Sequence, residues 1–256
     1  MCTEIIAVEH LQKSFSGLEV IKDISFNVHK GEVLGIIGPS GSGKSTLLRC
    51  ITQLERVSSG LIRICGQTLV SNQMEKGQLK PVYASKEEMR DIALKVGLVF
   101  QNFNLFPHFT VLQNVNEAQI QVLKKSPEEA TENSLALLKK MSLEEKIHSY
   151  PCELSGGQMQ RVSIARALAL EPEVLCFDEP TSALDPELTG EILKVIRSLA
   201  DEKMTMIVVT HEIAFARDLC DNALFMDQGL IVEQGLAQSL ITKPKNKRTQ
   251  AFLSRF

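Results

Sequence analysis

The sequence has 256 residues, of which 44% are hydrophobic and 23% are charged, and its formal net charge is −3. A chain of this length and composition forms one large or two modest globular domains, since domains contain roughly 100–200 residues. It lacks the strongly basic balance typical of proteins that act mainly on nucleic acid, so we expect no nucleic-acid partner.

Cysteine usage and hydropathy bear on where the chain works. The six cysteines, at positions 2, 50, 65, 152, 176 and 220, form no CxxC pair and no zinc-site spacing. This pattern indicates a reducing, cytosolic compartment. The N-terminus MCTEIIAVEH has acidic residues where a signal peptide needs a basic and then an apolar segment. No apolar stretch reaches the roughly 20 residues that span a bilayer, so we expect the chain not to cross a membrane by itself.

The N-terminal third alternates short strands with helices. The segments IIAVEHLQKSF, SFNVHK and GLIRICG predict antiparallel strands. VLGIIG, at 33–38, is almost continuously apolar and predicts a buried parallel strand. A glycine-rich loop and the helix STLLRCITQLER follow it. Residues 66–84 are expected to form a loop insertion, and SKEEMRDIALKV predicts a helix with a capping box of Ser85 and Glu88.

The rest of the chain predicts three more buried strands, GLVF, VLCF and MTMIVVT, each followed by polar residues. Ligands bind at that end of the strands in open α/β sheets. SPEEATENSLALLKKM predicts a helix with Pro127 just inside a Ser126 cap, and DPELTGEILKVIRSLADEK predicts another amphipathic helix. ALFMDQGLIVEQG predicts a hairpin that turns at Gln228 and Gly229, before a short basic end. The expected fold is one α/β domain with an antiparallel sheet in its N-terminal part and a helical insert.

The loop GPSGSGKST matches G-x-x-x-x-G-K-[ST] and lies between a predicted strand and a predicted helix. Its backbone N–H groups can surround the phosphates of a nucleotide, Lys44 can neutralise the outer phosphates, and Ser45 can ligate Mg²⁺. A glycine-rich turn without a ligand is the alternative, and the strand–loop–helix context argues against it. The candidate nucleotide-binding residues of this P-loop are Gly38, Pro39, Ser40, Gly41, Ser42, Gly43, Lys44, Ser45 and Thr46.

Polar residues at other strand ends complete a candidate catalytic site. In VLCFDEP, we expect Asp178, beside the P-loop strand, to hold Mg²⁺, and Glu179 to polarise the attacking water. General-base assistance of this kind contributes roughly 10²–10⁴ in rate. Gln101 follows GLVF and His211 follows MTMIVVT. Either residue alone is more often an ordinary loop residue, but converging strand ends favour His211 as a γ-phosphate contact and Gln101 as a metal and water contact.

At this point a P-loop kinase or GTPase and a motor ATPase are both open. A GTPase needs an N-K-x-D motif, and here Asn246-Lys247 is followed by Arg248-Thr249. A kinase needs a lid and an acceptor site, and it has no use for a second phosphate-type loop. Such a loop is present in LSGGQMQR, where Ser155 can cap a helix while Gly156 and Gly157 leave its N-terminus accessible.

The ordered set of motifs resembles the nucleotide-binding subunit of ATP-binding-cassette (ABC) transporters over essentially the whole chain. These motifs are GPSGSGKST, Gln101, LSGGQ, VLCFDEP, SALD at 182–185, and His211. The resemblance implies a P-loop NTPase core with a parallel sheet, an N-terminal antiparallel β-subdomain and an inserted α-helical subdomain. The core then covers 1–100 and 160–256, and the helical insert covers approximately 101–159.

The resemblance also implies a head-to-tail dimer of two copies that sandwiches two ATP. The signature residues Ser155, Gly156, Gly157 and Gln158 then contact the ATP on the other copy's P-loop, and Asp185 crosses the same interface. The signature needs no lysine because the partner's Lys44 already supplies one. Hydrolysis removes the γ-phosphate and the dimer opens, which is a ligand-driven population shift.

An aromatic residue near the N-terminus stacks on adenine in this family, usually a tyrosine. The matching residue is Phe15 in LQKSF, which keeps the π-face. Stacking of a base on an aromatic ring is worth roughly 1–3 kcal/mol. A core phenylalanine at a strand end is the alternative for this position.

FQNFNLFPHFTVLQNV, SKEEMRDIALKVG and RTQAFLSRF resemble the cassettes that serve polar-amino-acid importers. The resemblance implies a peripheral ATPase at the cytoplasmic face of the membrane, bound to integral membrane permease subunits and served indirectly by a secreted or periplasmic solute-binding protein. The alternatives are an exporter or lipoprotein-release ATPase, and a soluble ABC ATPase without a transport role.

Phe100, Phe103, Phe106 and Phe109 recur every third residue around Gln101. Phe100 lies inside a predicted strand, so we expect it in the core. The other three interleave with polar residues, which is typical of a partly exposed groove. Such a groove can receive a short helix of the permease, whereas core packing is the alternative.

Overall fold

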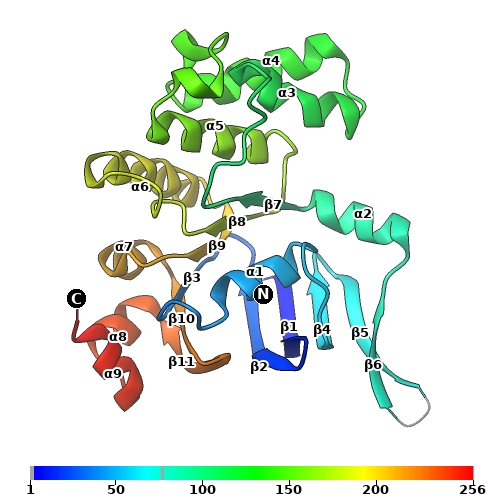
Figure 1. The fold of residues 1–256 in the computed structure, drawn as a ribbon, viewed down its shortest axis with the longest axis vertical. Coiled ribbons are helices and arrows are strands. Elements are labelled where there is room, and N and C mark those ends of the chain that lie inside the picture. The colour runs from blue at the N-terminus through cyan, green and yellow to red at the C-terminus, as the bar shows by residue number, and fades with distance from the viewer. Residues whose placement is uncertain (1–2, 76–77, 256) are drawn as a thin grey trace.

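An 11-stranded sheet organises the fold within residues 3–75 and 78–255, the part of the chain that the computed structural model describes (Figure 1). Its strand order is β6-β5-β4-β1-β2-β11-β10-β3-β9-β8-β7. The strands are β1 Glu4–Phe15, β2 Leu18–His29, β3 Val33–Ile37, β4 Ser59–Ile64, β5 Gln67–Glu75, β6 Gln78–Tyr83, β7 Val96–Val99, β8 Val174–Asp178, β9 Thr205–Val209, β10 Asn222–Asp227 and β11 Leu230–Leu236.

The half of the sheet from β10 to β7 is parallel throughout. Every residue of β3, β8 and β9 is buried, which explains why these strands are nearly continuous apolar segments in the sequence. Strand β9 lies between β3 and β8. The expectation that Asp178 follows the strand beside the P-loop strand is therefore wrong. Sequence order does not fix strand order, because a crossover helix can return the chain past a strand that is added later.

The other half of the sheet is antiparallel, as predicted: β1 pairs with both β2 and β4. The two halves meet where β2 runs parallel to β11, and Asp23 with Leu230 is the position at which they pair. Strands β10 and β11 form the predicted hairpin around Gln228 and Gly229. At this turn the Gly229 carbonyl accepts a hydrogen bond from the Lys22 N–H, which joins the hairpin to β2.

Residues 66–84 do not form the expected loop insertion. They contain the β5–β6 hairpin, in which Val70 pairs with Tyr83 and Asn72 pairs with Pro81, while residues 76–77 lie outside the described part of the chain. Leu69 and Val70 are buried and anchor the hairpin in the core. Pro81 is tolerated because β6 is the edge strand of the sheet, and proline within sheets is largely confined to edge strands.

Helices cover both faces of the sheet, and α3, α4 and α5 gather at the end of the molecule beyond β7 (Figure 1). The helices are α1 Lys44–Ile51, α2 Lys86–Leu94, α3 Val111–Gln121, α4 Pro127–Lys140, α5 Gly156–Leu168, α6 Pro186–Asp201, α7 Ile213–Leu219, α8 Ala237–Thr242 and α9 Lys247–Leu253, with short 3-10 turns η1 Glu144–Lys146 and η2 Pro151–Glu153. Among the described residues, no helix combines the length and apolar character that a membrane span requires.

Local sequence signals explain where most of these helices start. The capping box of Ser85 with Glu88 at α2 is confirmed, as are the Ser126 cap and Pro127 start of α4. Helix α1 is shorter than expected. It ends at Ile51, because Gln53 adopts a left-handed φ of 63° and the N–H groups of Leu54 and Glu55 both turn back to the Arg49 carbonyl.

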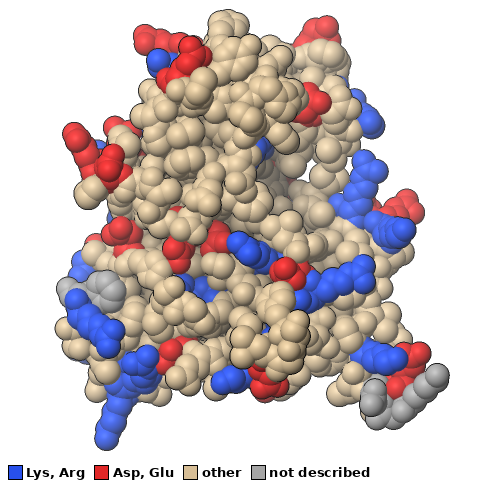
Figure 2. All heavy atoms as spheres, viewed as in Figure 1, with Lys and Arg blue, Asp and Glu red and all other residues tan. Residues whose placement is uncertain are grey.

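Two hydrophobic cores lie on opposite faces of the sheet. In β3, Val33 and Ile37 belong to the core that packs under α3 to α8, whereas Leu34 and Ile36 belong to the core shared with α1 and the antiparallel strands. This alternation places β3 at the centre of the protein and makes its C-terminal end a rigid platform for the loop that follows. Charged side chains of both signs are scattered over the face in Figure 2 and form no continuous field of either sign.

Candidate active site

The P-loop joins β3 to α1 through backbone geometry that only glycine adopts without strain. Gly38 has a φ of 148°, and a Cβ there would lie 2.0 Å from the Met226 carbonyl oxygen. Gly43 has a φ of 100°, and its Cβ would lie 3.0 Å from the Val20 carbonyl oxygen. Both glycines let the loop pass close to neighbouring backbone, and the loop thereby places the start of α1 near the C-terminal end of β3.

The N-terminus of α1 faces the loop without a side-chain cap, because its N-cap residue is Gly43. Its first backbone N–H groups therefore remain available to an anion, and the helix dipole favours negative charge there. Within the loop, the Ser42 N–H is already directed at the Pro39 carbonyl, 3.3 Å away. The backbone amides at the start of α1 are therefore the candidate site for an anion.

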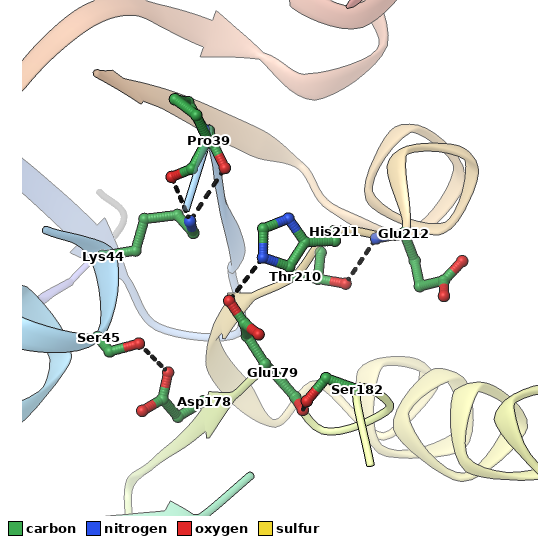
Figure 3. A network of polar contacts seen from close by, with 10 residues as sticks. Pro39, Lys44, Ser45, Asp178, Glu179, Ser182, Thr210, His211 and Glu212 are labelled. Carbon is green, nitrogen blue, oxygen red and sulfur yellow. Dashed lines mark hydrogen bonds and ion pairs between the residues drawn. The ribbon is translucent and has the colours of Figure 1, made fainter. Parts of the chain in front are cut away.

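Lys44 lies inside this site with its ammonium group held by carbonyl groups. Its Nζ donates to the carbonyl oxygens of Gly38 and Pro39, at 2.9 and 3.0 Å (Figure 3). Burial lowers the pKa of Lys44, and the nearby carboxylates Glu179 and Asp178 oppose that shift. A buried cation held only by neutral carbonyl oxygens gains strongly from an incoming phosphate.

Asp178, at the end of β8, and Ser45, in α1, meet although β9 separates β8 from β3, the strand that precedes the P-loop. The Ser45 hydroxyl donates to Asp178 Oδ1 at 2.7 Å, and Asp178 is 6% exposed. A hydroxyl and a carboxylate oxygen are hard ligands of the kind that Mg²⁺ takes from proteins, together with phosphate and water. No group of three or more His, Cys, Asp or Glu that could hold a metal occurs among the described residues.

Glu179 and His211 form the second polar pair of the site. Glu179 Oε1 lies 2.7 Å from His211 Nε2, and the two side chains point toward each other across the ends of β8 and β9 (Figure 3). Glu179 has a left-handed φ of 50°, and its N–H donates to the Val209 carbonyl. This turn aims the carboxylate at the P-loop instead of continuing the strand.

Lys44, Ser45 and Glu179 line a cleft of about 330 Å³, whereas Asp178 and His211 are not among its lining residues. Gln101, which follows β7, faces the same cleft and is exposed, so the ends of three strands contribute to it. Val20 also lines the cleft, and the sequence patterns did not indicate it. The lining residues are Val20, Ser40, Gly41, Gly43, Lys44, Ser45, Thr46, Gln101 and Glu179.

Phe15 ends β1 with 39% of its surface exposed, so it is not a core residue. The Lys13 ammonium lies 4.2 Å from the centre of its ring. Lys13 is itself fixed by Glu55 Oε2 at 3.0 Å and by the Arg56 carbonyl at 2.7 Å. The ring is therefore held in place by a cation while part of its surface stays accessible.

The signature loop lies apart from this cleft on its own chain. Ser155 caps α5 as predicted: its Oγ accepts the Gln158 N–H at 3.3 Å, and Gln158 Oε1 accepts the Ser155 N–H at 3.0 Å. Asp185, the N-cap residue of α6, is exposed and makes no side-chain cap bond. None of residues 155–158 lines the P-loop cleft.

The phenylalanine-rich segment after β7 is largely exposed. Phe106 is 46% exposed, and its ring lies 5.3 Å from that of Phe109. Phe100 is half-buried and belongs to neither core, so the expectation that it packs in the core is wrong. The reason is that β7 already ends at Val99, at the edge of the sheet. Sequence reasoning also missed Arg166, whose guanidinium binds the backbone of this segment.

Comparison with known proteins places the chain in a family. A family model described as "ABC transporter" matches residues 21–182. The L-cystine transport system ATP-binding protein TcyN of Escherichia coli is 53% identical over 251 residues, which is 98% of each chain. The histidine/lysine/arginine/ornithine transport ATP-binding protein HisP of E. coli is 51% identical over 95% of this chain and 94% of its own. The glutamine transport ATP-binding protein GlnQ of Bacillus subtilis is 45% identical over 98% of each chain.

Solved structures agree with the fold. CbiO1 of Clostridium perfringens, part of the ABC transporter complex cbiONQ, superposes with a TM-score of 0.80 at 32% identity and covers 99% of this chain and 97% of its own. The ATP-binding cassette MJ0796, in a dimeric post-hydrolysis state bound to ADP and Pi, gives a TM-score of 0.77 at 32% identity over 91% of this chain and 99% of its own. The chain therefore belongs to the ABC transporter family, as one of its ATP-hydrolysing cassettes.

Proposed function

We propose that the chain powers the uptake of a polar amino acid through a membrane permease. The observation that carries this is the set of curated relatives at 45–53% identity, which are named for transport of cystine, glutamine and basic amino acids. An ATPase for export or lipoprotein release and a soluble ABC ATPase without a transport role are less well supported, because those relatives are named for amino-acid transport systems.

In this proposal the P-loop binds the phosphates of ATP. The amides at the start of α1 contact the phosphate oxygens, and the Lys44 ammonium exchanges the carbonyls of Gly38 and Pro39 for a phosphate oxygen. The exchange is favourable because a neutral acceptor is replaced by an anionic one in a buried site. Phe15 offers its exposed ring to the adenine.

Glu179 accepts the proton of the attacking water. A carboxylate only accepts hydrogen bonds, so His211 Nε2 carries the proton of their 2.7 Å contact. That bond occupies Oε1 and orients the side chain, which leaves Oε2 for the water. Ser45, Asp178 and Gln101 are the residues that would hold Mg²⁺, and the ion would neutralise charge on the phosphates.

We further propose a head-to-tail dimer of two copies. Ser155, Gly156, Gly157 and Gln158 lie outside the cleft of their own chain, and Ser155, the N-cap residue of α5, is exposed. A second copy can bring this surface to the γ-phosphate, with Asp185 at the same interface. The dimeric state given for MJ0796 supports this arrangement.

The exposed segment around Phe106 is the proposed contact for the permease. With that contact the cassette sits at the cytoplasmic face of the membrane as a peripheral subunit, and a solute-binding protein acts through the permease. We also keep the division into a core of 1–100 and 160–256 with a helical insert at approximately 101–159 as part of the proposal. Helices α3 and α4 fall in that insert.

The test is amino-acid uptake by the chain co-expressed with its permease in a strain that lacks its own uptake systems. Radiolabelled cystine, glutamine, arginine and histidine are supplied one at a time, with the Glu179→Gln subunit as the inactive control. We expect ATP-dependent uptake of at least one of them. Efflux of these compounds, or ATPase activity that no permease and no amino acid stimulates, would contradict the proposal.

A further inference from the structure

Arg166, on the helix that begins with the signature glycines, binds the backbone of the segment that follows Gln101. Its Nη1 donates to the Asn104 carbonyl at 2.7 Å, and its Nη2 donates to the Phe103 carbonyl at 3.0 Å. The planar guanidinium matches two neighbouring acceptors with fixed geometry. The same group lies 5.9 Å from the centre of the Phe106 ring.

The segment that Arg166 holds is strained. Phe103 and Asn104 are consecutive non-glycine residues with left-handed φ values of 57° and 51°. Such a conformation persists only where the surroundings impose it. Beyond them, Asn114 fixes the segment again: its Oδ1 accepts the Phe106 N–H at 2.8 Å, and its Nδ2 donates to the Phe106 carbonyl at 3.2 Å.

Arg166 makes this contact without a carboxylate partner. It belongs to none of the ion pairs found between the described residues, and burial lowers its pKa. By contrast, Arg161 on the same helix pairs with Glu191 at 2.6 Å. A partly buried guanidinium that binds only carbonyl oxygens and an aromatic ring is suited to holding backbone in place.

The held segment also contacts the start of α5. A Cβ placed on Gly156 would lie 3.8 Å from Phe103 Cζ, so the Phe103 ring packs beside the signature loop. Gly156 and Arg166 are ten residues apart in one helix, or roughly 15 Å along its axis. The segment therefore touches α5 near its start and again at Arg166.

We propose that Arg166 is a positioning residue that joins the segment after Gln101 to α5, so that a displacement of Gln101 reaches Ser155 as a rigid-body movement. Without Arg166, the strained segment can change its backbone conformation when Gln101 moves, and α5 with Ser155 then does not move with it. The inference rests on the proposed function for the role of Gln101, whereas the anchoring of the segment itself does not.

The first test is hydrogen exchange of the nucleotide-free protein, which needs no activity. In Arg166→Met the amides of residues 102–106 should exchange about tenfold faster, the change that loss of one or two hydrogen bonds gives. Arg166→Lys should fall between Arg166→Met and wild type. The matched control is Arg161→Met, which removes an ion pair of the same helix and should leave these amides unchanged. Equal exchange in Arg166→Met and wild type overturns the anchoring.

The second test is ATP hydrolysis. Arg166→Met should lower kcat about tenfold with an unchanged KM for ATP, because the nucleotide is bound by other residues. The double variant with Gln101→Ala should be no slower than Gln101→Ala alone, since both act through one segment. Additive losses overturn the proposal, and if Arg166→Met fails to fold, Arg166→Lys carries both tests. A wild-type protein without ATPase activity would contradict the proposed function instead, and the exchange result would still stand.

Discussion

The P-loop and the signature loop both lead into helix N-termini, yet their surroundings differ. In the P-loop region, Lys44 and Asp178 are almost fully buried. Lys44 donates to carbonyl oxygens of its own loop, whereas Asp178 accepts a hydrogen bond from Ser45, which lies in a distant segment of the same chain. In the signature loop, Ser155 is exposed, and its cap bonds involve Gln158 one turn away. The first region has a nearly complete ligand set within one chain. The second starts a helix with an exposed cap residue but lies outside the cleft of its own chain, and in the proposed dimer the other copy completes it.

The largest effect is expected where the first region is most complete. Glu179→Gln should lower kcat by about 100-fold or more while ATP still binds, because the amide cannot accept the proton but keeps the shape of the side chain. Loss of one negative charge should also favour the ATP-bound dimer, which gel filtration with ATP detects. The control is Glu212→Gln, whose side chain points away from the network in Figure 3. Hydrolysis by Glu179→Gln near the wild-type rate would identify another group as the base.

Mixing two inactive subunits tests whether the second region is completed by another copy. Lys44→Ala and Ser155→Arg should each be inactive alone, and mixing them should restore ATPase activity through one intact composite site per heterodimer. Ser126→Arg is the matched control, because Ser126 caps α4 in the same way without belonging to the site. Each cap is worth about 0.5–2 kcal/mol, so the control separates loss of stability from loss of the site. Heterodimers that form without activity would argue against a shared site.

A glycine-to-alanine substitution should reduce folding stability more in the P-loop than in the signature loop. Gly38→Ala places a Cβ 2.0 Å from a backbone oxygen at a positive φ, so it should destabilise the fold by about 3 kcal/mol or more. Gly156→Ala brings its Cβ to 3.0 Å from a flexible Leu184 side chain, and it should cost about 1 kcal/mol or less. Thermal unfolding measures both. Similar melting temperatures for the two variants would show that the P-loop is less tightly packed than its contacts indicate.

A surface outside both regions is expected to matter only in the assembled transporter. Phe106→Ala should change the unfolding free energy by less than about 1 kcal/mol and leave basal ATPase activity near normal, since the side chain is 46% exposed. Permease association and transport should fall. Leu135→Ala, at an apolar residue of α4 that is 40% exposed, is the control. Normal transport by Phe106→Ala would remove this residue from the permease contact.

The smallest expected effect is a difference in thiol reactivity between Cys176, near the P-loop region, and Cys152, near the signature loop. Burial raises the pKa of Cys176, on the strand that leads to Asp178, to about 12 from 9.0, whereas Cys152 before the signature loop is exposed. The raised pKa keeps the folded Cys176 thiol protonated, so its contribution to stability is full below pH 9 and is lost as the pH rises toward 12. Iodoacetamide at pH 8 should therefore label Cys152 and spare Cys176, as peptide mass mapping would reveal. Rapid labelling of Cys176 in the folded protein would contradict its burial.

The sequence predicted the parts of this molecule that are specified locally. The apolar strands β3, β8 and β9, the caps at Ser85 and Ser126, and the glycine loop all depend on neighbouring residues. The position of β9 between β3 and β8 was missed, because strand order depends on long-range packing. The β5–β6 hairpin was missed because Pro81 and polar residues conceal an edge strand whose support comes from β4.

In the candidate site, too, single residues could be predicted from local motifs, whereas the contacts between them could not. Single residues with a characteristic chemistry, such as Lys44 and Glu179, were predicted from motifs and strand ends. The hydrogen bond between Glu179 and His211 and the one between Ser45 and Asp178 appear only when the strands are assembled. Arg166 gave no signal in the sequence, because an arginine in an amphipathic helix is ordinary until its acceptors are known.

The left-handed φ of 50° at Glu179 has a consequence for how cassettes of this kind change over time. A non-glycine residue in that conformation costs the fold about 1–2 kcal/mol, which glycine at the same position would not. Stability and turnover therefore make opposing demands on this position. A lineage released from the need to hydrolyse ATP would gain stability by discarding the carboxylate. Glycine or asparagine directly after Asp178 would then relieve the strain at the expense of the carboxylate.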